Sequence, residues 1–405
     1  MDFSYGEKID DLIEQVMLFV NETVIPAETT YAEQRGEIGQ WDTPPIIEDL
    51  KRVARSRGLW NLFLPGDDRG YGLSNLEYAP LAELSGRSPW IAPEAMNCSA
   101  PDTGNMEILA HFASRSVQDQ WLTPLLEGQI RSVYSMTEPD VASSDANNIS
   151  TLIEPDGEGF RINGRKWWSS GALSPRCKIA IVMGVSDPNG ERHQRHSMVA
   201  VPLQTEGVKV LRSTSVFGYS DGAHGGHGVI HYDNVWVPRE NLLGELHGGF
   251  AIAQARLGPG RIHHAMRLVG MAERAFDLMC ERSYVRFPFG NSIAELGVFQ
   301  DWVAQARIKI EQVRLLVLKT AWLMDTVGSR AAAVEISAIK VAAPEMATWV
   351  IDRAIQTFGG AGVSQDTPLA ELYALARTLH IADGPDEVHK MSLARRELKR
   401  YAPSL

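Results

Sequence analysis

The sequence pattern changes twice along the chain, and this change constrains the fold more than any other feature. Residues 131–243 contain short β-rich runs separated by Gly, Pro, Asp and Asn, whereas the flanking stretches show the three-and-four spacing of amphipathic helices. Short strands without helices between them predict an antiparallel barrel or sandwich rather than a Rossmann unit. The expected strands are Ser132–Met136, Ile149–Ile153, Phe160–Ile162, Ile179–Val185, His196–Pro202, Val208–Leu211 and Gly228–Val237.

Helices are expected on both sides of this region. Those before it are Glu7–Thr23, Ile46–Leu59, Leu76–Ser85 and Val117–Glu127, and those after it are Phe250–Cys280, Ala294–Val327, Ala331–Phe358 and Pro385–Tyr401. Pro344 should kink or break the seventh of these helices, because it removes a backbone donor. The order predicts an α+β chain with three domains: N-terminal helices (1–131), an antiparallel β-barrel (132–245) and a C-terminal four-helix bundle (246–405).

Composition restricts the partners and the compartment. The net charge of −11 disfavours nucleic acid, because that partner requires clustered Lys and Arg to neutralise phosphates. No stretch approaches the roughly 18 apolar residues of a membrane helix, and the start of the chain lacks a secretory signal, so we expect a cytoplasmic protein without membrane insertion. Cys98, Cys177 and Cys280 form neither a disulfide framework nor a metal pair, and we expect buried thiols.

Two segments of the β region carry groups suited to a flavin. Tyr134–Asp145 surrounds Pro139 with small and hydroxylated residues, whose backbone N–H groups and hydroxyls can bind a ring and a pyrophosphate without adding charge. By itself it could equally be a solvent-exposed loop. Lys166–Gly171 places two adjacent indoles before two hydroxyls, which is also the pattern of an ordinary strand with aromatic side chains in the core.

Two further segments lie in the C-terminal helical region. Gln356–Gly362 ends a long helix, so its glycines are typical of a C-cap, and the absence of a preceding strand excludes a dinucleotide-binding fingerprint. Asp383–His389 is rich in carboxylates, which are common at a helix N-terminus. Asp383, however, precedes Gly384 outside the expected helix, where its carboxylate can face a cleft.

Taken together, these motifs resemble the acyl-CoA dehydrogenase family over essentially the whole chain. The segments Glu94–Glu107, Thr137–Asn148, Ala255–His264 and Ala382–His389 are most similar to the subgroup of family members ten and eleven and their bacterial relatives. The resemblance implies the three-domain fold, FAD as cofactor and an acyl-CoA substrate. It also implies an electron-transferring flavoprotein as electron acceptor and a homodimer or homotetramer, because the family shares its cofactor across subunits.

The resemblance assigns roles residue by residue. Asp383 would be the catalytic base, and Ser144, Arg261 and Gly384 would contact the substrate. The flavin and its pyrophosphate would contact Tyr134, Met136, Thr137, Ser143, Ser144, Trp168, Ser169 and Ser170. The ADP half and the phosphates would contact Arg286, Phe289, Gln356, Phe358, Gly359, Gly360, Pro385, Asp386 and Glu387.

The chain departs from the family pattern at three places. Pro385-Asp386-Glu387 stands where the family usually has Thr-Ser-Gln, so only backbone N–H groups could serve the phosphates there. Gly297 stands where many members carry an ADP-binding Gln. Asp383 replaces the more common Glu and is about one methylene, or roughly 1.5 Å, shorter, so the backbone must come closer or the substrate must sit deeper.

The implied reaction is α,β-dehydrogenation of an acyl thioester by proton abstraction and hydride transfer to flavin N5. An acyl-CoA oxidase of the same fold and a non-catalytic flavin or acyl-CoA binder are the alternatives. A metal enzyme, suggested by His193 with His196 and by His224, His227 and His231, is disfavoured because no Cys or carboxylate completes a ligand set. His263 and His264 face different sides of one helix, and we expect His264 to be a packing residue.

Overall fold

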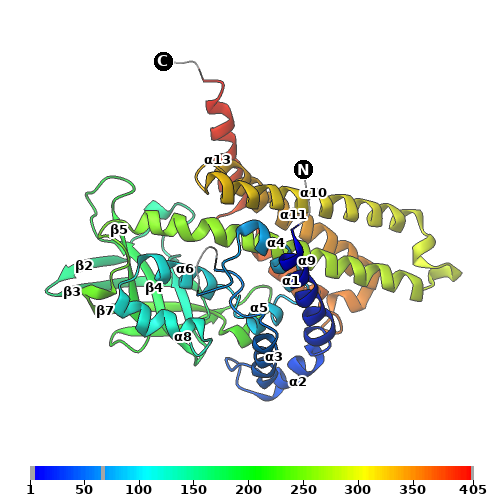
Figure 1. Ribbon diagram of the computed structural model, residues 1–405, viewed down its shortest axis with the longest axis horizontal. Coiled ribbons are helices and arrows are strands. Elements are labelled where there is room, and N and C mark those ends of the chain that lie inside the picture. The colour runs from blue at the N-terminus through cyan, green and yellow to red at the C-terminus, as the bar shows by residue number, and fades with distance from the viewer. Residues whose placement is uncertain (1–4, 65–68, 403–405) are drawn as a thin grey trace. The chain divides into compact units, whose positions relative to one another are not determined.

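The computed structural model describes residues 5–64 and 69–402, and these form two compact units. The first comprises Met1–Pro26, Leu73–Pro93 and Gly260–Leu405, and the second comprises Ala27–Gly72 and Glu94–Pro259. Figure 1 labels the elements. Among the described residues, no helix is both long and apolar enough to cross a membrane.

The second unit contains a curled, seven-stranded sheet within the described residues. Its strands are β1 (Arg131–Ser135), β2 (Leu152–Asp156), β3 (Gly159–Ser170), β4 (Cys177–Val185), β5 (His196–Pro202), β6 (Val208–Thr214) and β7 (His227–Pro238). The hydrogen-bonded order is β1-β4-β2-β3-β7-β6, with β5 paired to β4. Most pairs are antiparallel, as expected, but β1 and β4 pair in parallel, and so do β2 and β4 at one position. Within the antiparallel sheet that was expected, the parallel pairs are those that β4 makes with β1 and β2.

The core of this unit is formed by side chains that point inward from its strands. Inward side chains from six of the strands form one fully buried cluster that includes Val133, Phe160, Val182, Val199 and Tyr232. Because successive strand residues face opposite sides, this alternation is what made the strands predictable. The helices of the unit are α2 (Glu28–Glu37), α3 (Pro45–Ser56), α6 (Asp102–Phe112), α7 (Arg115–Val117), the π-helix η2 (Gln118–Leu122) and α8 (Thr123–Leu126). Sequence analysis had missed α2 and α6.

A buried charge network connects α3, α6 and β1 in the same unit. Glu94 bonds Arg131 and accepts from Lys51 Nζ at 2.8 Å, and Arg131 Nε lies 2.6 Å from Asp102 Oδ2. Asp102 also accepts from the backbone N–H of Ser132 at 2.7 Å. Burial opposes ionisation of Glu94, but Arg131 and Lys51 outweigh it and lower the pKa of that carboxyl. The charges stay buried because each has a partner.

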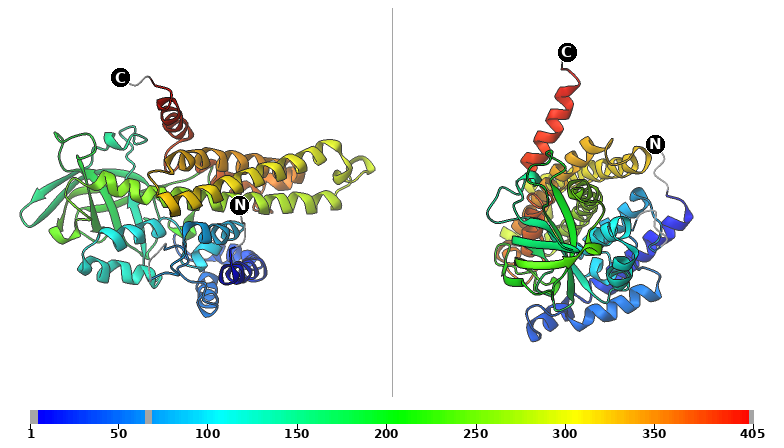
Figure 2. Two further views of the ribbon diagram at one scale, coloured as in Figure 1. Left: turned by 45° about the horizontal axis from the view of Figure 1, so that its top comes forward. Right: turned by 90° about the vertical axis from the view of Figure 1, so that its left-hand side faces the viewer.

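The first unit is helical. It contains α1 (Glu7–Leu18) followed by the π-helix η1 (Phe19–Val24), α4 (Asn75–Gly86), α10 (Gly297–Val327), α11 (Ala333–Phe358), α12 (Leu369–Thr378), α13 (Asp386–Lys399) and, from Gly260 onward, α9 (Gly249–Val285). Figure 2 shows α10 and α11 running alongside each other. The helix α12 had not been predicted. Pro344 lies inside α11, which continues through it, so the expectation of a break was wrong.

Glycines allow α4 and α9 to approach closely. A Cβ at Gly270 would lie 1.8 Å from the carbonyl oxygen of Glu83, and one at Gly86 would lie 2.2 Å from that of Arg267. The same helices are tied to α10 by Arg314, which donates to Glu83 at 2.8 Å and also bonds Glu273. Close backbone packing and one bridging guanidinium thus fix α9, the helix that carries Arg261 of the predicted site.

Candidate functional site

The structure joins the two segments of the second unit that were predicted to bind the flavin. The backbone N–H of Trp167 on β3 donates to the carbonyl of Thr137 at 3.0 Å. Lys166 Nζ donates to the carbonyl of Met136 and to Glu138 Oε1, both at 2.8 Å. Residues separated by about thirty positions in the sequence therefore form one continuous surface.

The Lys166–Glu138 pair anchors this surface. The side chains are 0% and 2% exposed, and Glu138 also accepts from the backbone N–H groups of Ser150 and Thr151 at 2.8 Å. Burial opposes the charge of Glu138, but Lys166 and these hydrogen bonds hold its pKa at about 2. Burial lowers the pKa of Lys166 to about 8 despite the opposing effect of Glu138. Both partners are thus charged at neutral pH and fix the loop from beneath.

A β-bulge sets the direction of Trp168. The β3–β7 register shifts between Lys166 and Ser169, and Trp168 has a left-handed φ of 51°. Bulges of this kind redirect a side chain out of the strand alternation. The Trp168 ring lies 5.3 Å from the imidazole of His227, whose Nδ1 is 2.9 Å from Ser170 Oγ. The indole and the hydroxyl are therefore supported by the same histidine.

The predicted flavin residues divide into two groups. Those whose half-buried or exposed side chains could also contact a ligand are Tyr134, Met136, Thr137, Ser144, Trp168 and Ser170, although Tyr134 packs against Arg256 and Ser170 Oγ lies 2.9 Å from His227 Nδ1. The other two hydroxyls are used within the fold. Ser143 Oγ accepts from the N–H of Glu138 at 2.9 Å, and the fully buried Ser169 Oγ lies 3.3 Å from Ser135 Oγ.

The available groups fit a flavin. They are aromatic, thioether and hydroxyl groups without charge, as a largely neutral ring system requires. The buried Trp167 Nε1 has no hydrogen-bond partner among the described residues, so a donor remains unused in this segment. The chemistry of the surface is therefore compatible with the isoalloxazine ring.

A buried cation beside Tyr134 had not been predicted. The guanidinium of Arg256 lies 4.0 Å from the centroid of the Tyr134 ring. The nearby Glu107 is 8% exposed, and its burial raises its pKa to about 8 although Arg256 acts in the opposite direction. The only signal in the sequence for this pair was a weak one: both residues lie in segments that resemble the family. Arg256 thus adds a cation to a surface that was predicted to be neutral.

In the first unit, the predicted base lies in a tight left-handed turn. Asp383 has a φ of 56° and Gly384 a φ of 103°, directly before α13. The carbonyl oxygen of Asp383 accepts from Arg261 Nε and from His389 Nε2, each at 3.2 Å. Burial and Arg261 lower the pKa of His389 to about 4, so this imidazole is neutral near pH 7. Two donors on two helices thus hold the backbone of the turn.

The carboxylate of Asp383 faces α9. His264 Nε2 lies 3.7 Å from Asp383 Oδ2, which would also be 3.8 Å from a Cβ at Gly260. The neighbouring His263 is buried instead, with its ring edge-to-face against Tyr78. The two histidines do face different sides, as predicted, and His264, which was expected to be a packing residue, lies beside the Asp383 carboxylate.

Lys340 is a second residue at this turn that sequence analysis missed. It lies on α11, is 2% exposed, and donates from Nζ to the carbonyl of Leu379 and, at 3.4 Å, to that of Gly384. Burial lowers its pKa to about 8, while Asp383 and Asp386 act in the opposite direction. A single lysine therefore holds both ends of the turn.

The residues after the turn lie at the start of α13. Pro385 precedes its first residue, and Glu387 is exposed. Asp386 Oδ2 lies 2.6 Å from His380 Nδ1, whereas its buried Oδ1 has no hydrogen-bond partner among the described residues. The Asp386 carboxylate is thus paired within the protein, which leaves only the N-terminal end of α13 to face a phosphate.

The residues predicted to hold the ADP half lie on exposed parts of the first unit. Gly359 ends α11 with a φ of 63°, and nothing described lies within 4 Å of a Cβ at Gly359 or Gly360. Gln356 is exposed, and Phe358 lies 5.1 Å from the Arg282 guanidinium. Arg286 is exposed and Phe289 is fully exposed in the turn after α9. The space above the glycines can therefore accept a ligand at close approach.

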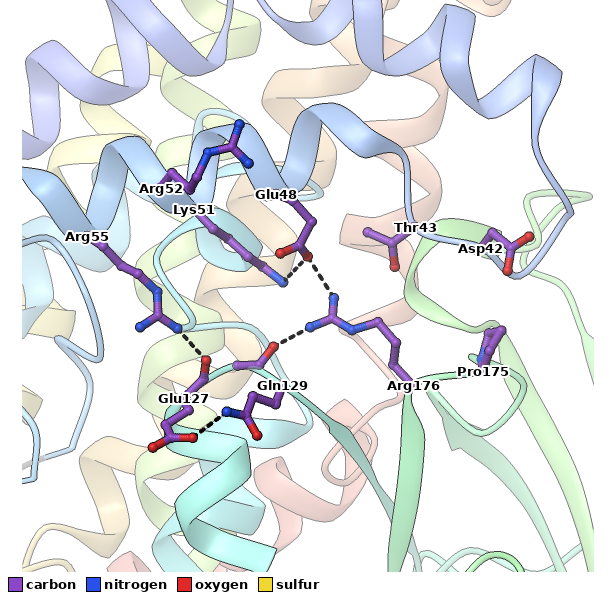
Figure 3. A pocket seen from close by; sticks show the side chains of 11 residues that line it. Asp42, Thr43, Glu48, Lys51, Arg52, Arg55, Glu127, Gln129, Pro175 and Arg176 are labelled. Carbon is purple, nitrogen blue, oxygen red and sulfur yellow. Dashed lines mark hydrogen bonds and ion pairs between the residues drawn. The ribbon is translucent and has the colours of Figure 1, made fainter.

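Figure 3 shows a separate pocket in the second unit. Its volume is about 830 Å³, and it is lined by Asp42, Thr43, Glu48, Lys51, Arg52, Arg55, Glu127, Gly128, Gln129, Pro175 and Arg176. None of the predicted site residues is among them. Its cations are already paired: Lys51 and Arg176 contact Glu48 at 3.1 Å, and Arg55 donates to the carbonyl of Glu127. We therefore assign no ligand to it.

The histidines that suggested a metal do not form a metal site in the described part of the chain. No three His, Cys, Asp or Glu side chains gather there as metal ligands. His224 instead pairs with Asp221 at 2.9 Å, and His193 lies 4.3 Å from the ring of Phe250.

Comparison with known proteins identifies the family. Residues 133–235 match the middle domain of acyl-CoA dehydrogenases, and residues 247–398 match the C-terminal domain. The chain is 56% identical to FadE2 of Mycobacterium tuberculosis over 402 residues, which cover 99% of this chain and 98% of FadE2. It is 49% identical to human acyl-CoA dehydrogenase family member 11, of which it spans 52%.

Solved structures agree with this comparison. An acyl-CoA dehydrogenase structure from Mycobacterium abscessus superposes with a TM-score of 0.95 at 50% identity, covering 99% of this chain and 100% of that one. The butyryl-CoA dehydrogenase of Megasphaera elsdenii superposes with a TM-score of 0.82 at 24% identity, covering 98% and 100%. This second similarity concerns the fold alone.

Proposed function

The chain belongs to the acyl-CoA dehydrogenase family, and from this premise we propose that it oxidises an acyl-CoA thioester to the trans-2-enoyl-CoA with Asp383 as the base. The observation that carries the proposal is the geometry of the Asp383 turn. Its backbone oxygen is held by Arg261 and His389, and its carboxylate is 17% exposed. A fixed, largely desolvated carboxylate is suited to removing a proton from a weak carbon acid.

FAD, the cofactor of this family, supplies the hydride acceptor at flavin N5 when it is bound. The groups of the second unit that would hold the ring are the available ones described above, Tyr134, Met136, Thr137, Ser144, Trp168 and Ser170, with Ser143 and Ser169 supporting them from within the fold. The ADP half would lie over Gln356, Phe358, Gly359 and Gly360, with the backbone of Pro385, Asp386 and Glu387 at the phosphates.

The residues of this chain have distinct tasks in the reaction. Asp383 would accept the α-proton, and its own backbone N–H would polarise the thioester carbonyl, as the family resemblance implies. Gly384, Arg261 and Ser144 would contact the substrate. The fixed turn prevents the short Asp383 side chain from moving away from the reacting carbon, which is the main requirement for general-base catalysis.

The exposed turn after α9 supports a shared cofactor. Phe289 is fully exposed and adopts a left-handed φ of 56°, a costly arrangement for an aromatic residue unless a partner covers it. We therefore propose that Arg286 and Phe289 contact FAD bound mainly by a second subunit, in a homodimer or homotetramer. We also propose an electron-transferring flavoprotein as the electron acceptor.

The test is anaerobic reduction of bound flavin by acyl-CoA. The purified protein is screened against short, long, branched and hydroxylated acyl-CoAs, and Asp383→Asn is compared with Asp277→Asn, which removes a carboxylate of α9 that pairs with Arg87. We expect bleaching in the wild type and in Asp277→Asn but none in Asp383→Asn, which should retain FAD.

Each other outcome is informative. Turnover by Asp383→Asn would eliminate Asp383 as the base. In the same screen repeated in air, consumption of oxygen with formation of peroxide would favour an acyl-CoA oxidase. A wild-type protein whose bound flavin is reduced by none of these substrates would be a non-catalytic binder.

A further inference from the structure

One face of α9 is directed at the Asp383 turn. Gly260 and His264 lie four residues apart and Arg261 and His264 three apart, spacings that bring side chains together on one side of a helix. Arg261 bonds the backbone oxygen of Asp383, whereas Gly260 and His264 both border its carboxylate oxygen Oδ2, which lies 3.7 Å from His264 Nε2. On this face of α9, His264 is thus a side chain that lies beside the Asp383 carboxylate itself.

Exposure increases from the carboxylate to the imidazole. The Asp383 side chain is 17% exposed and that of His264 is 25% exposed. A proton received by Asp383 must leave before the next turnover, because a protonated carboxyl is no longer a base. His264 Nε2, which lies 3.7 Å from Asp383 Oδ2, offers a nitrogen through which that proton can reach water.

We propose that His264 is a positioning residue that acts through Asp383 by accepting the proton that Asp383 has removed from the substrate. This inference rests on the proposed function of Asp383. The balance is simple: the α-C–H bond breaks as Asp383 O–H forms, then that O–H breaks as His264 Nε2–H forms, and the imidazolium passes the proton to water. The hydride leaves separately for FAD, so the transfer to His264 requires no oxidant.

The other charged and titratable groups around the turn are less suited to this task. Arg261 on α9 is permanently charged, and Lys340 on α11 donates to two carbonyls. On α13, His389 donates to the Asp383 carbonyl and Asp386 pairs with His380. Imidazole ordinarily changes charge between roughly pH 5 and 8, which suits His264 for exchanging a proton near neutral pH.

The test measures proton exchange without oxidation. A 3-thiaacyl-CoA deuterated at the α-carbon has sulfur at the β position, so it can lose a proton but no hydride. His264→Gln keeps an amide N–H near the position of Nε2 but cannot carry the proton. We expect deuterium loss to solvent to slow by about tenfold or more in this variant.

The pH profile of exchange gives the second readout. The imidazole can accept the proton only while it is neutral, so its loss should remove this ionisation from the profile and shift the acidic limb. With an oxidisable substrate, kcat should fall while KM stays nearly constant. Wild-type exchange and an unmoved acidic limb in His264→Gln would show a merely structural role and overturn the proposal.

Controls separate the two proposals. His231→Gln removes an imidazole of β7 and should leave exchange unchanged; if it slows exchange equally, the effect is not specific to His264. If Asp383→Asn still exchanges deuterium, the proposed function fails. If Asp383→Asn is inert and His264→Gln is normal, only the role of His264 fails. Should His264→Gln not fold, His264→Asn gives the same comparison with a smaller amide.

Discussion

The buried Lys166–Glu138 pair leads to a quantitative prediction for Lys166→Met. This change removes the charge partner of a carboxylate whose side chain is 2% exposed, and with it the bond to the carbonyl of Met136. Leaving one partner of a buried pair unpaired costs about 3–5 kcal/mol of unfolding free energy. Because Glu138 keeps its bonds to Ser150 and Thr151, we expect the lower end of this range, about 3 kcal/mol.

The assay is urea unfolding at pH 7, followed by circular dichroism and by tryptophan fluorescence, since Trp167 and Trp168 adjoin the substituted residue. The double variant Lys166→Met with Glu138→Gln removes the uncompensated charge and should recover about 1–2 kcal/mol of the loss. FAD affinity should fall in the single variant, because the pair holds the carbonyl of Met136. A loss below about 1 kcal/mol for Lys166→Met would refute the view that this pair anchors the loop.

Three further predictions follow from the packing and charges. Gly270→Ala should lower the unfolding free energy by about 3 kcal/mol or more, because its Cβ would meet the Glu83 carbonyl. Gly297→Ala, whose Cβ meets nothing described, should be neutral or slightly stabilising. Thermal melts compare the two variants, and equal melting temperatures would contradict the close α4–α9 contact. Gly384→Ala should reduce kcat at least tenfold while FAD stays bound. The φ of 103° at this position is unfavourable for alanine, and the added Cβ would lie 2.9 Å from His389 Nε2. Unchanged kinetics would show that the turn tolerates the change. Because the pKa of Glu138 is lowered, its contribution to stability is present above its ordinary pKa of about 4.5 and is lost as the pH falls towards about 2. Acid unfolding of Glu138→Gln should therefore depend less on pH in this range. An acid-unfolding profile equal to that of the wild type would contradict this prediction.

The sequence was informative where a periodic pattern dominates local structure. The continuous apolar runs of β4 and β5 and the long apolar stripes of α10 and α11 determined their elements, because these strands are buried on both faces and these helices on one. The parallel pairing of β1 with β4 was not predictable, since strand direction depends on the path of the chain rather than on side-chain alternation. The polar helix α2 was missed because it buries mainly Tyr31.

The same distinction holds for the candidate site. Asp383 and Arg261 stand at motif positions, so their sequence context identified them. Lys340 did not stand out, because a single lysine within the apolar pattern of α11 gives no sign that its ammonium reaches two carbonyls thirty-nine and forty-four residues away. The orientation of Trp168 likewise depends on a bulge that arises from the pairing of β3 with β7.

The left-handed backbone of Asp383 gives a conformational reason for the identity of the base. Asp and Asn adopt positive φ more readily than other residues with a Cβ, because their short polar side chains can bond locally. A Glu at a φ of 56° would lose this advantage while adding a methylene to a space already bounded by Gly260 and His264. The difference from the common family residue is therefore explained by the handedness of one turn: where the chain must turn to the left, the shorter acid is the one that the backbone accepts.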